Sequence, residues 1–367
     1  MNKKFYKIKN EKKITISRTI IFTLTVALFL LTSCNTSSHE KGDEVFGVIT
    51  TMGNKAKSYI DYYDKNLELV ITESLKYAEL GGITTAPVYV EDSIFILPRG
   101  NYYEGYDNKV LEINKKTFDI ETYEFKNYAF MSLAADEGKI YTVMTEGPSP
   151  LARIEALDRK NGELKEVSLK GLANYMYSTG KKLFVFYNTY SADEPMSFVD
   201  IYTSELDLIE TINLNQYGSY QNNGLLLDEF LYIPTPRKLN DDESNLVLKI
   251  NINDFKIECI ELNESLPFEI LHYKNSLLIS HYDYTNQNQE NSKLTILNLE
   301  TGEQIVKNLD RIAEKIEVYE DSLYVFNQEK ITKYDLSDNL KKIKEVDINM
   351  RDVIYFSTVI NLKQHSN

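Results

Sequence analysis

Apolar and polar residues alternate in two different ways along this chain. Residues Thr19–Leu31 form one almost continuous apolar run behind a lysine-rich segment. From Val45 onward, the apolar residues instead come in short runs separated by Asn, Asp and Gly. Short runs that are rich in Val, Ile, Tyr, Phe and Leu predict β-strands. No long helical pattern with capping residues follows the first run, so the body of the chain is expected to be all-β.

The short runs repeat at a nearly constant interval. Six similar strands have their second residues at positions 94, 140, 183, 231, 277 and 323, which gives steps of 46, 43, 48, 46 and 46. Val45–Thr50 matches the pattern one step upstream and forms a degenerate seventh copy. In each copy a loop of variable length, a second strand, a polar turn and a third strand follow, and a fourth strand leads into the next copy.

Four short strands in a repeat of this length predict the blades of a β-propeller. Seven blades would use residues 45–362 and leave 363–367 as a tail. The first copy lacks its innermost strand, whereas a spare strand at 352–360 follows the last copy. We therefore expect the C-terminal strand to complete the first blade, because an open sheet edge invites aggregation. Six or eight blades are the alternative counts.

Two turns carry a resemblance to a known class of propellers. Residues 156–162 (ALDRKNG) and 297–302 (LNLETG) each precede a strand. They resemble the Asp-x-x-Thr-Gly turn of PQQ-like and YVTN-like bacterial propellers. The resemblance implies the architecture and specifies no function. The chain contains no Trp, which disfavours WD40 repeats, Asp-box sialidase blades and the tryptophan-bearing blades of quinoprotein dehydrogenases.

The N-terminus has the pattern of an export signal. The apolar run of 13 residues is short for a membrane-spanning helix, which needs about 20 residues. Leu31-Thr-Ser-Cys34 directly after it resembles the lipobox of bacterial lipoproteins. That resemblance implies a signal peptide at 1–33, a diacylglyceryl group on Cys34, a flexible tether to residue 44 and a place on the extracytoplasmic face of the cell membrane. An ordinary cleaved signal and an uncleaved anchor helix are the alternatives.

Charge and cysteine content narrow the partners. Residues 1–33 carry seven basic side chains and one acidic one, so the net charge of −14 leaves −20 on residues 34–367. An acidic body repels phosphate, which argues against a nucleic acid partner. Cys259 is the only other cysteine. With Cys34 lipidated it has no disulfide partner, and its apolar surroundings predict a buried strand residue.

Sequence motifs for catalysis are missing from the chain. There is no Gly-rich phosphate loop, no zinc-binding His-Glu-x-x-His pair and no Gly-x-Ser-x-Gly elbow. The acidic run Asp241–Glu243 lacks the alternating oxygen-ligand spacing of calcium loops and is interpreted as a solvated loop. His281 is interpreted as an exposed loop residue, with a role as ligand or base as the alternative. No catalytic residue, cofactor or metal site is predicted.

One face of the predicted propeller carries unusually long loops. The loop after the second strand of each blade lies on the same face as the links between blades, and these loops are rich in Tyr, Asn, Asp and Pro. Tyr combines a rigid apolar ring with a polar tip and is enriched at binding surfaces. The candidate ligand face comprises Tyr102, Tyr103, Tyr106, Asp107, Tyr190, Asp193, His281, Tyr282, Asp283 and Tyr284.

These features predict a membrane-anchored binding module for a protein, a peptide or a glycan. The alternatives are an extracytoplasmic lyase or hydrolase with its site at the mouth of the propeller channel, and an accessory factor for the assembly of exported proteins. The fold does not choose among them. Two or more ionisable side chains converging in the channel would favour the enzyme, and a contiguous Tyr patch on the long loops would favour the binding module.

Overall fold

The computed structural model describes residues 44–364 except 83–84, 102–104, 146–150, 191–194, 287–288 and 290. Within these ranges the chain consists of strands and turns, and no helix occurs. It follows that the described part of the chain contains no helix long and apolar enough to cross a membrane.

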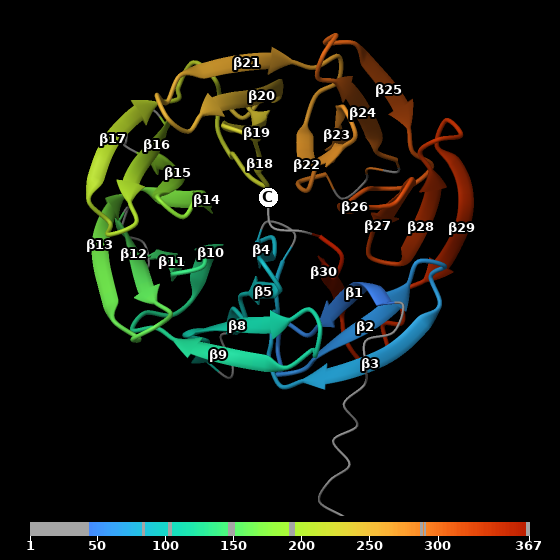
Figure 1. Ribbon diagram of the computed structural model, residues 1–367, viewed down its shortest axis with the longest axis horizontal. Coiled ribbons are helices and arrows are strands. Elements are labelled where there is room, and N and C mark those ends of the chain that lie inside the picture. Colours follow the sequence, from blue (N-terminus) through green and yellow to red (C-terminus); the bar gives the residue numbers. More distant parts are fainter. Residues whose placement is uncertain are drawn as a thin grey trace, which may run out of the picture. The chain divides into compact units, whose positions relative to one another are not determined.

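Seven four-stranded antiparallel sheets stand as blades around a central channel (Figure 1). Blades 1 to 4 are made, from the innermost to the outermost strand, as follows. Blade 1 has β30 (Tyr355–Asn361), β1 (Glu44–Thr51), β2 (Ser58–Asp64) and β3 (Leu69–Leu75), and blade 2 has β4 (Val88–Val90), β5 (Ser93–Ile96), β8 (Lys109–Asn114) and β9 (Ile120–Glu124). Blade 3 has β10 (Phe130–Ala135), β11 (Lys139–Thr145), β12 (Leu151–Asp158) and β13 (Leu164–Lys170). Blade 4 has β14 (Leu172–Ser178), β15 (Lys182–Tyr190), β16 (Pro195–Thr203) and β17 (Leu208–Asn213).

The remaining three blades follow the same order. Blade 5 has β18 (Leu225–Leu227), β19 (Phe230–Arg237), β20 (Glu243–Asn251) and β21 (Ile257–Glu261); blade 6 has β22 (Pro267–Tyr273), β23 (Ser276–His281), β24 (Lys293–Asn298) and β25 (Gln304–Asn308); blade 7 has β26 (Lys315–Tyr319), β27 (Ser322–Phe326), β28 (Lys330–Asp335) and β29 (Lys341–Asp347). A small hairpin of β6 (Gly100–Asn101) and β7 (Gly105–Tyr106) lies in the loop between β5 and β8.

The predicted blade count and ring closure are both confirmed. β30 pairs antiparallel with β1, from Phe46 opposite Asn361 to Thr51 opposite Tyr355. The last strand of the chain thus supplies the innermost strand of the first blade, and the alternatives of six or eight blades are wrong.

Three contacts hold this closing segment in place. Gly47 lies opposite Ile360, and a Cβ atom on Gly47 would come within 2.6 Å of the Ile360 side chain, so only glycine fits there. Arg351, just before β30, donates hydrogen bonds of 2.9 and 2.6 Å to both carboxylate oxygens of Asp61 on β2, whose side chain is 1% exposed. The Ser357 hydroxyl donates to the carbonyl of Leu80, which leads into blade 2.

The hydrophobic core is divided into seven layers, one between each pair of neighbouring blades. The layer between blades 7 and 1 contains Phe46, Tyr324 and Phe356, and the rings of Phe46 and Tyr324 are 4.5 Å apart. Each blade is covered on both faces, as expected for sheets whose strands are apolar on both sides.

A similar turn joins the third and fourth strands of every blade. Its first residue is Asp, Asn or Thr, and the side-chain oxygen of that residue accepts hydrogen bonds from backbone N–H groups further along the turn. These residues are Asp64, Asn114, Asp158, Thr203, Asn251, Asn298 and Asp335. The turn recognised from the sequence in blades 3 and 6 has the same backbone hydrogen bonds in blades 2 and 5, is one residue shorter in blades 1 and 4, and differs in blade 7, although its first residue plays the same part in all seven.

The chain returns from this turn through a residue in the left-handed conformation. Blades 3 and 6 use Gly162 and Gly302 there, with φ of 73° and 72°. Four other blades use a large apolar residue with φ near 60°, although such residues rarely adopt this conformation. Their side chains belong to the layers between blades, so packing offsets the backbone cost; the four are Leu67, Phe118, Leu206 and Phe255.

Cys259 is not buried, contrary to its interpretation from the sequence. It lies on β21, the outermost strand of blade 5, and its side chain is exposed and free of any disulfide among the described residues. The neighbouring Ile257 and Ile260 are the half-buried residues of this strand. The apolar run was real, but Cys259 falls on its outward side.

The interpretation of His281 as an exposed loop residue is also wrong. His281 ends β23 and is buried. Its Nδ1 lies 2.7 Å from the carbonyl of Ser265 and its Nε2 lies 2.7 Å from the hydroxyl of Thr295. This geometry suits a neutral ring that donates from Nδ1 and accepts at Nε2. Burial lowers the pKa of His281 to about 4.

Removing β30 should open the ring. We expect a chain that ends at Asn349 to aggregate or to unfold at a much lower temperature, because β1 loses its backbone partners and Phe46 loses its cover. Thermal unfolding followed by circular dichroism would measure the loss. A chain that lacks only residues 365–367 is the control. An unchanged unfolding temperature in the longer deletion would contradict the closure.

His281 should make the protein less stable in acid. The folded state resists protonation of this ring down to about pH 4, whereas an unfolded histidine binds its proton near pH 6.5. The unfolded state is therefore favoured as the pH falls between these values, by up to about 3 kcal/mol at the lower end. We expect His281→Gln to remove this part of the pH dependence in urea unfolding.

The matched control for this measurement is His272→Gln, which changes an exposed histidine on β22. The raised pKa values of Glu314 and Glu317 act in the opposite direction, because the folded state then holds more protons. The quantity to compare is therefore the difference between each variant and the wild type. Equal slopes for the two variants would refute the assignment to His281.

Candidate functional site

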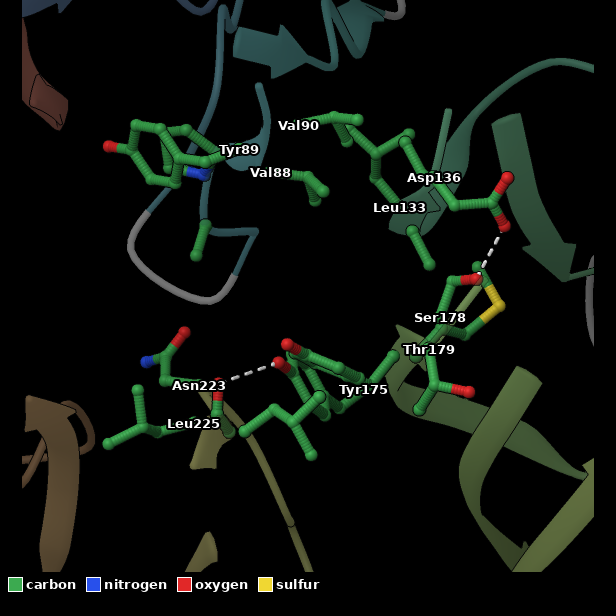
Figure 2. A pocket seen from close by; sticks show the side chains of 18 of the residues that line it. Val88, Tyr89, Val90, Leu133, Asp136, Tyr175, Ser178, Thr179, Asn223 and Leu225 are labelled. Carbon is green, nitrogen blue, oxygen red and sulfur yellow. Dashed lines mark hydrogen bonds between the residues drawn. The ribbon is translucent and has the colours of Figure 1, made fainter. Parts of the chain in front are cut away.

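Two hollows lie on or near the propeller axis, within the described residues. The larger has a volume of ≈ 720 Å³ and is lined by the innermost strands, including β4, β10, β14, β18, β22 and β26 (Figure 2). The smaller, of ≈ 370 Å³, lies between the long loops. We call the first the channel cavity. The two faces of the ring are the long-loop face, with the links between blades, and the opposite short-turn face.

The channel cavity reaches the short-turn face. Its rim there includes Glu91, Asp136 and Thr179, which lie in turns between the first and second strands of their blades. The hydroxyl of Ser178 donates a 2.6 Å hydrogen bond to Asp136, which ties blades 3 and 4 together at this rim (Figure 2).

The two sides of the channel cavity differ in polarity. Blades 2 to 5 contribute a mostly apolar and aromatic wall: Val88, Tyr89, Leu133, Tyr175, Met176 and Leu225. Blades 6 and 7 contribute Glu269, Lys315 and Glu317. A cavity of this size with a few convergent polar groups has the dimensions of a small-molecule site.

Glu269 is the centre of a buried polar cluster. It accepts hydrogen bonds from Lys315 Nζ and, at 2.9 Å, from Asn223 Nδ2, and all three side chains are at least nine-tenths buried. Burial raises the pKa of Glu269, while the ammonium of Lys315 opposes the shift. A buried pair of this kind is held by its hydrogen bonds, since desolvation removes most of its Coulomb gain.

Glu317 has no cationic partner of its own. It is one strand-period from Lys315 on β26, and its carboxylate accepts a 2.9 Å hydrogen bond from Asn361 Nδ2 on β30. The backbone N–H of Asn361 donates in turn to the hydroxyl of Tyr89. Burial, and secondarily the charge of Glu269, raises the pKa of Glu317 to about 8.

Three polar atoms in the lining of the channel cavity have no hydrogen-bond partner among the described residues. One is Oε1 of Gln364; the other two, Asn223 Oδ1 and Thr85 Oγ1, belong to buried residues. The residues themselves are 7% and 5% exposed. Orphaned buried polar atoms are uncommon in native proteins and call for an explanation, such as a bound molecule.

The long-loop face holds those predicted ligand residues that the structure describes. Tyr106 is 51% exposed and stacks on the 55% exposed Tyr128, with ring centroids 6.4 Å apart. Arg99 links this pair to the exposed Met131: its carbonyl accepts a hydrogen bond from the N–H of Asp107, next to Tyr106, and its Nη2 is 3.8 Å from the Met131 sulfur. Asp107 is half-buried between these elements, and burial raises its carboxyl pKa.

The smaller hollow continues this surface toward the axis. Its walls are formed by Tyr282, Tyr284 and Tyr355, together with Arg99 and Glu79. Tyr282 packs edge-on against the buried Phe268, at 5.3 Å between ring centroids, whereas Tyr284 is more exposed. Since Arg99 contacts Met131 and also lines the hollow, the aromatic patch and the hollow are continuous. We call the whole surface, with Tyr106, Tyr128 and Met131, the tyrosine patch.

Asp283 takes a structural position within this face. Its carboxylate accepts hydrogen bonds from Arg237 at 2.7 Å and from the backbone and hydroxyl of Thr285. Burial pushes its pKa up, but the hydrogen bonds from Thr285 and Arg237 lower it below its usual range. Asp283 therefore braces two neighbouring loops, and its charge is already neutralised.

Several predicted residues fall outside the described part of the chain: Cys34, Tyr102, Tyr103 and Asp193. Tyr190 ends β15, but its side chain is not described. Asp241 and Asp242 lie in the turn before β20, and Glu243 begins that strand. No group of three or more His, Cys, Asp or Glu side chains in the described ranges is placed to hold a metal ion.

The charged wall of the channel was missed in the sequence. Lys315 and Glu317 belong to the run Glu314-Lys-Ile-Glu-Val-Tyr319, which was interpreted only as a strand leading into the next copy. Charges at alternate positions of an innermost strand were the available signal, because such positions face the channel. Their convergence with Glu269 and Asn223 depends on three different blades and is not visible along the chain.

No family model matches this chain, and no curated protein matches its sequence. Among solved structures, BamB from Moraxella catarrhalis is 11% identical, with a TM-score of 0.47 over 82% of this chain and 87% of that protein. AztD from Citrobacter koseri is 10% identical (TM-score 0.48; 86% and 98% covered), and Sqt1 from Saccharomyces cerevisiae is 10% identical (TM-score 0.49; 83% and 86% covered). Likeness at this level concerns the fold alone, so the function has to come from this chain's own geometry.

Proposed function

We propose that this chain is a lipid-anchored extracytoplasmic protein whose propeller binds a partner protein through the tyrosine patch. The observation that carries the proposal is the continuous surface of exposed Tyr106, Tyr128, Met131 and Tyr284 around Arg99. Tyr, Met and Arg are the residue types enriched in protein interfaces, and Tyr and Arg are common hot spots. Soluble proteins seldom expose such residues in a group without a function.

The position of the first strand supports this arrangement. In each blade the second strand runs from the short-turn face to the long-loop face, and β1 is the second strand of blade 1. A chain tethered through residues 35–44 would therefore enter the propeller on the short-turn face. The tyrosine patch on the opposite face would remain open to a partner.

The lipobox at Leu31–Cys34 supports the proposed membrane anchor, and the turns beginning at Asp158 and Asn298 support a place among PQQ-like and YVTN-like propellers. The acidic body, with −20 on residues 34–367, favours a partner with a basic or neutral contact surface. A peptide, a glycan or an exported protein that is being assembled would use the same surface. Identifying the captured molecule would distinguish these three kinds of partner.

A second candidate function has an observation of its own. Glu269, Lys315 and Glu317 converge in the channel cavity, and convergent ionisable groups in a cavity are a feature of enzyme sites. A protonated Glu317 beside the hydrogen-bonded pair of Glu269 and Lys315 would suit acid–base chemistry. This alternative predicts that Glu317→Gln abolishes turnover of a substrate that still binds, whereas the binding-module proposal places no essential role on Glu317.

Substituting the exposed tyrosines should weaken partner binding without unfolding the protein. We expect Tyr106→Ser, Tyr128→Ser and Tyr284→Ser together to reduce recovery of the crosslinked partner from intact cells by about 30-fold or more, which corresponds to one hot spot of about 2 kcal/mol. Exposed substitutions change stability by about 0.5 kcal/mol each at most. Tyr282 is left intact because it is the more buried of the two tyrosines that pack on Phe268, at 5.3 Å between ring centroids against 6.0 Å for Tyr284.

The control for this experiment changes three exposed turn residues on the short-turn face: Lys116→Ser, Lys160→Ser and Glu300→Ser. Thermal unfolding of both triple variants confirms that the fold is retained. Equal loss of the partner in both variants would show that the tyrosine patch is not the contact surface. Full recovery in both would move the contact to the outer strands or the channel.

The anchor is tested separately at Cys34, which lies outside the described residues. The thiol of this residue is the proposed acceptor of the diacylglyceryl group, whose two chains suffice for stable attachment. We expect Cys34→Ala to accumulate as an unprocessed precursor that takes up no labelled fatty acid. Labelling of the variant at the wild-type level would rule out the lipobox, and Cys259→Ala is the matched control.

A further inference from the structure

The channel cavity contains a carboxyl group, on Glu317, whose charge the protein does not balance when that group is ionised. Glu269 is paired with Lys315 and also accepts from Asn223. The hydrogen bond that Glu317 accepts comes from the neutral amide of Asn361, and its second carboxylate oxygen has no hydrogen-bond partner within the described part of the chain. An ionised Glu317 would therefore leave one net negative charge on the cavity wall.

The unpartnered oxygen of Asn223 belongs to the same polar cluster. The Asn223 amide group uses its nitrogen on Glu269, which leaves Oδ1, an acceptor, without a partner. The side chain is more than nine-tenths buried and lines the cavity. A ligand that satisfies this atom must bring an N–H or O–H donor, whereas the unpartnered hydroxyl of Thr85, elsewhere in the lining, can accept or donate.

The opposite wall calls for an apolar ligand body. Leu133, Met176 and Leu225 line the cavity together with the rings of Tyr89 and Tyr175 (Figure 2). Tyr175 is held in place by its own hydrogen bond of 3.1 Å to the carbonyl of Gly224. A Cβ atom at residue 224 would come within 3.0 Å of the Tyr175 ring, so glycine allows this close approach.

Other ligand classes fit these walls less well. The described residues offer no set of three side chains for a metal ion, and the one cation in the charged wall, Lys315, is already paired with Glu269. An anionic ligand at this wall would therefore meet two carboxylates and an ammonium that is already paired, since the other lysines of the lining, Lys139 and Lys181, lie at the short-turn rim. The net charge of the body, −20 over residues 34–367, also favours the entry of cations.

We propose that the channel cavity binds a small organic cation: a protonated amine with an apolar body. The ammonium group would pair with Glu317 and donate to the unpartnered oxygen of Asn223, and the apolar body would lie against Leu133, Met176 and Leu225. This site is separate from the tyrosine patch and does not depend on the function proposed for it.

Binding of a cation should be coupled to the release of a proton. The groups around Glu317 are Glu269 from β22, Lys315 from its own strand, Tyr89 from β4 and Asn361 from β30. Burial raises the pKa of Glu317 to about 8, so near neutral pH the empty site holds a proton. An ammonium ion favours the ionised carboxylate and displaces that proton. Affinity should therefore rise from about pH 6 to about pH 8.

Calorimetry with simple amines tests the proposal on the purified full-length protein in lipid nanodiscs. The probes are butylammonium, cyclohexylammonium and phenethylammonium, each compared with the alcohol and the carboxylate of the same carbon skeleton. We expect saturable binding of at least one amine below about 1 mM, at least tenfold weaker binding of its alcohol, and no binding of its carboxylate. Heats measured in buffers of different ionisation enthalpy should report the released proton.

Two variants separate this site from its surroundings. Glu317→Gln should weaken amine binding at least tenfold and abolish proton release. Glu314→Gln is the matched control, because Glu314 lies next to the same strand but is engaged by Gln328 and does not line the cavity. Thermal unfolding checks that both variants fold. Equal affinity for amine and alcohol, an unchanged affinity in Glu317→Gln, or no saturable binding of any amine up to about 10 mM would overturn the proposal.

Discussion

Every blade of this propeller is a sheet with two apolar faces, and neither face is covered until the ring is complete. This requirement explains why the core is divided into seven layers between blades and why the last strand of the chain returns to the first blade. The ladder between β30 and β1 carries the closure, and the fit of Ile360 over Gly47 fixes its register. Because each layer is shared by two blades, loss of one layer exposes two sheets at once. The stability of the ring is therefore a collective property of its closure.

Closure of the ring also creates the channel, whose walls do not pack against another sheet. One edge of each innermost strand faces the channel and is not covered by another strand. Charged side chains can therefore be placed there, although their partial removal from water costs free energy. Residues far apart in the chain meet in this space: Asn223, Glu269 and Lys315 come from blades 5, 6 and 7 and form one hydrogen-bonded cluster. A wall made only of Leu and Val would be easier to fold. The two carboxylates and the unpartnered polar atoms of the cavity lining are the observations on which the proposed amine site rests.

The architecture could be predicted from the sequence because a strand period and a blade repeat are local patterns. The repeat steps, the seven copies and the spare C-terminal strand all follow from residues close together in the chain. The burial of single side chains could not be predicted as well. The sequence predicted a buried Cys259 and an exposed His281, and the structure shows the reverse. Cys259 lies on the outward side of an edge strand, and His281 bonds to the loop before β22 and to Thr295 on β24. Of the tyrosine patch, the sequence singled out Tyr106 and Tyr284, whereas Tyr128, in a link between blades, and Met131, on β10, carry no distinguishing pattern.

The turns between the third and fourth strands show how a repeat can keep its structure while its amino-acid sequence changes. The left-handed position is occupied by glycine in blades 3 and 6 and by Leu or Phe in four others. Around Gly162 and Gly302 the space for a Cβ is empty, whereas Leu67 and Phe118 fill a layer of the core. One solution lowers the backbone energy, and the other offsets a strained backbone with buried area. Either solution reverses the chain between the two strands, so the blades can differ at this position. As a result, blades that are alike in structure show little sequence similarity to one another.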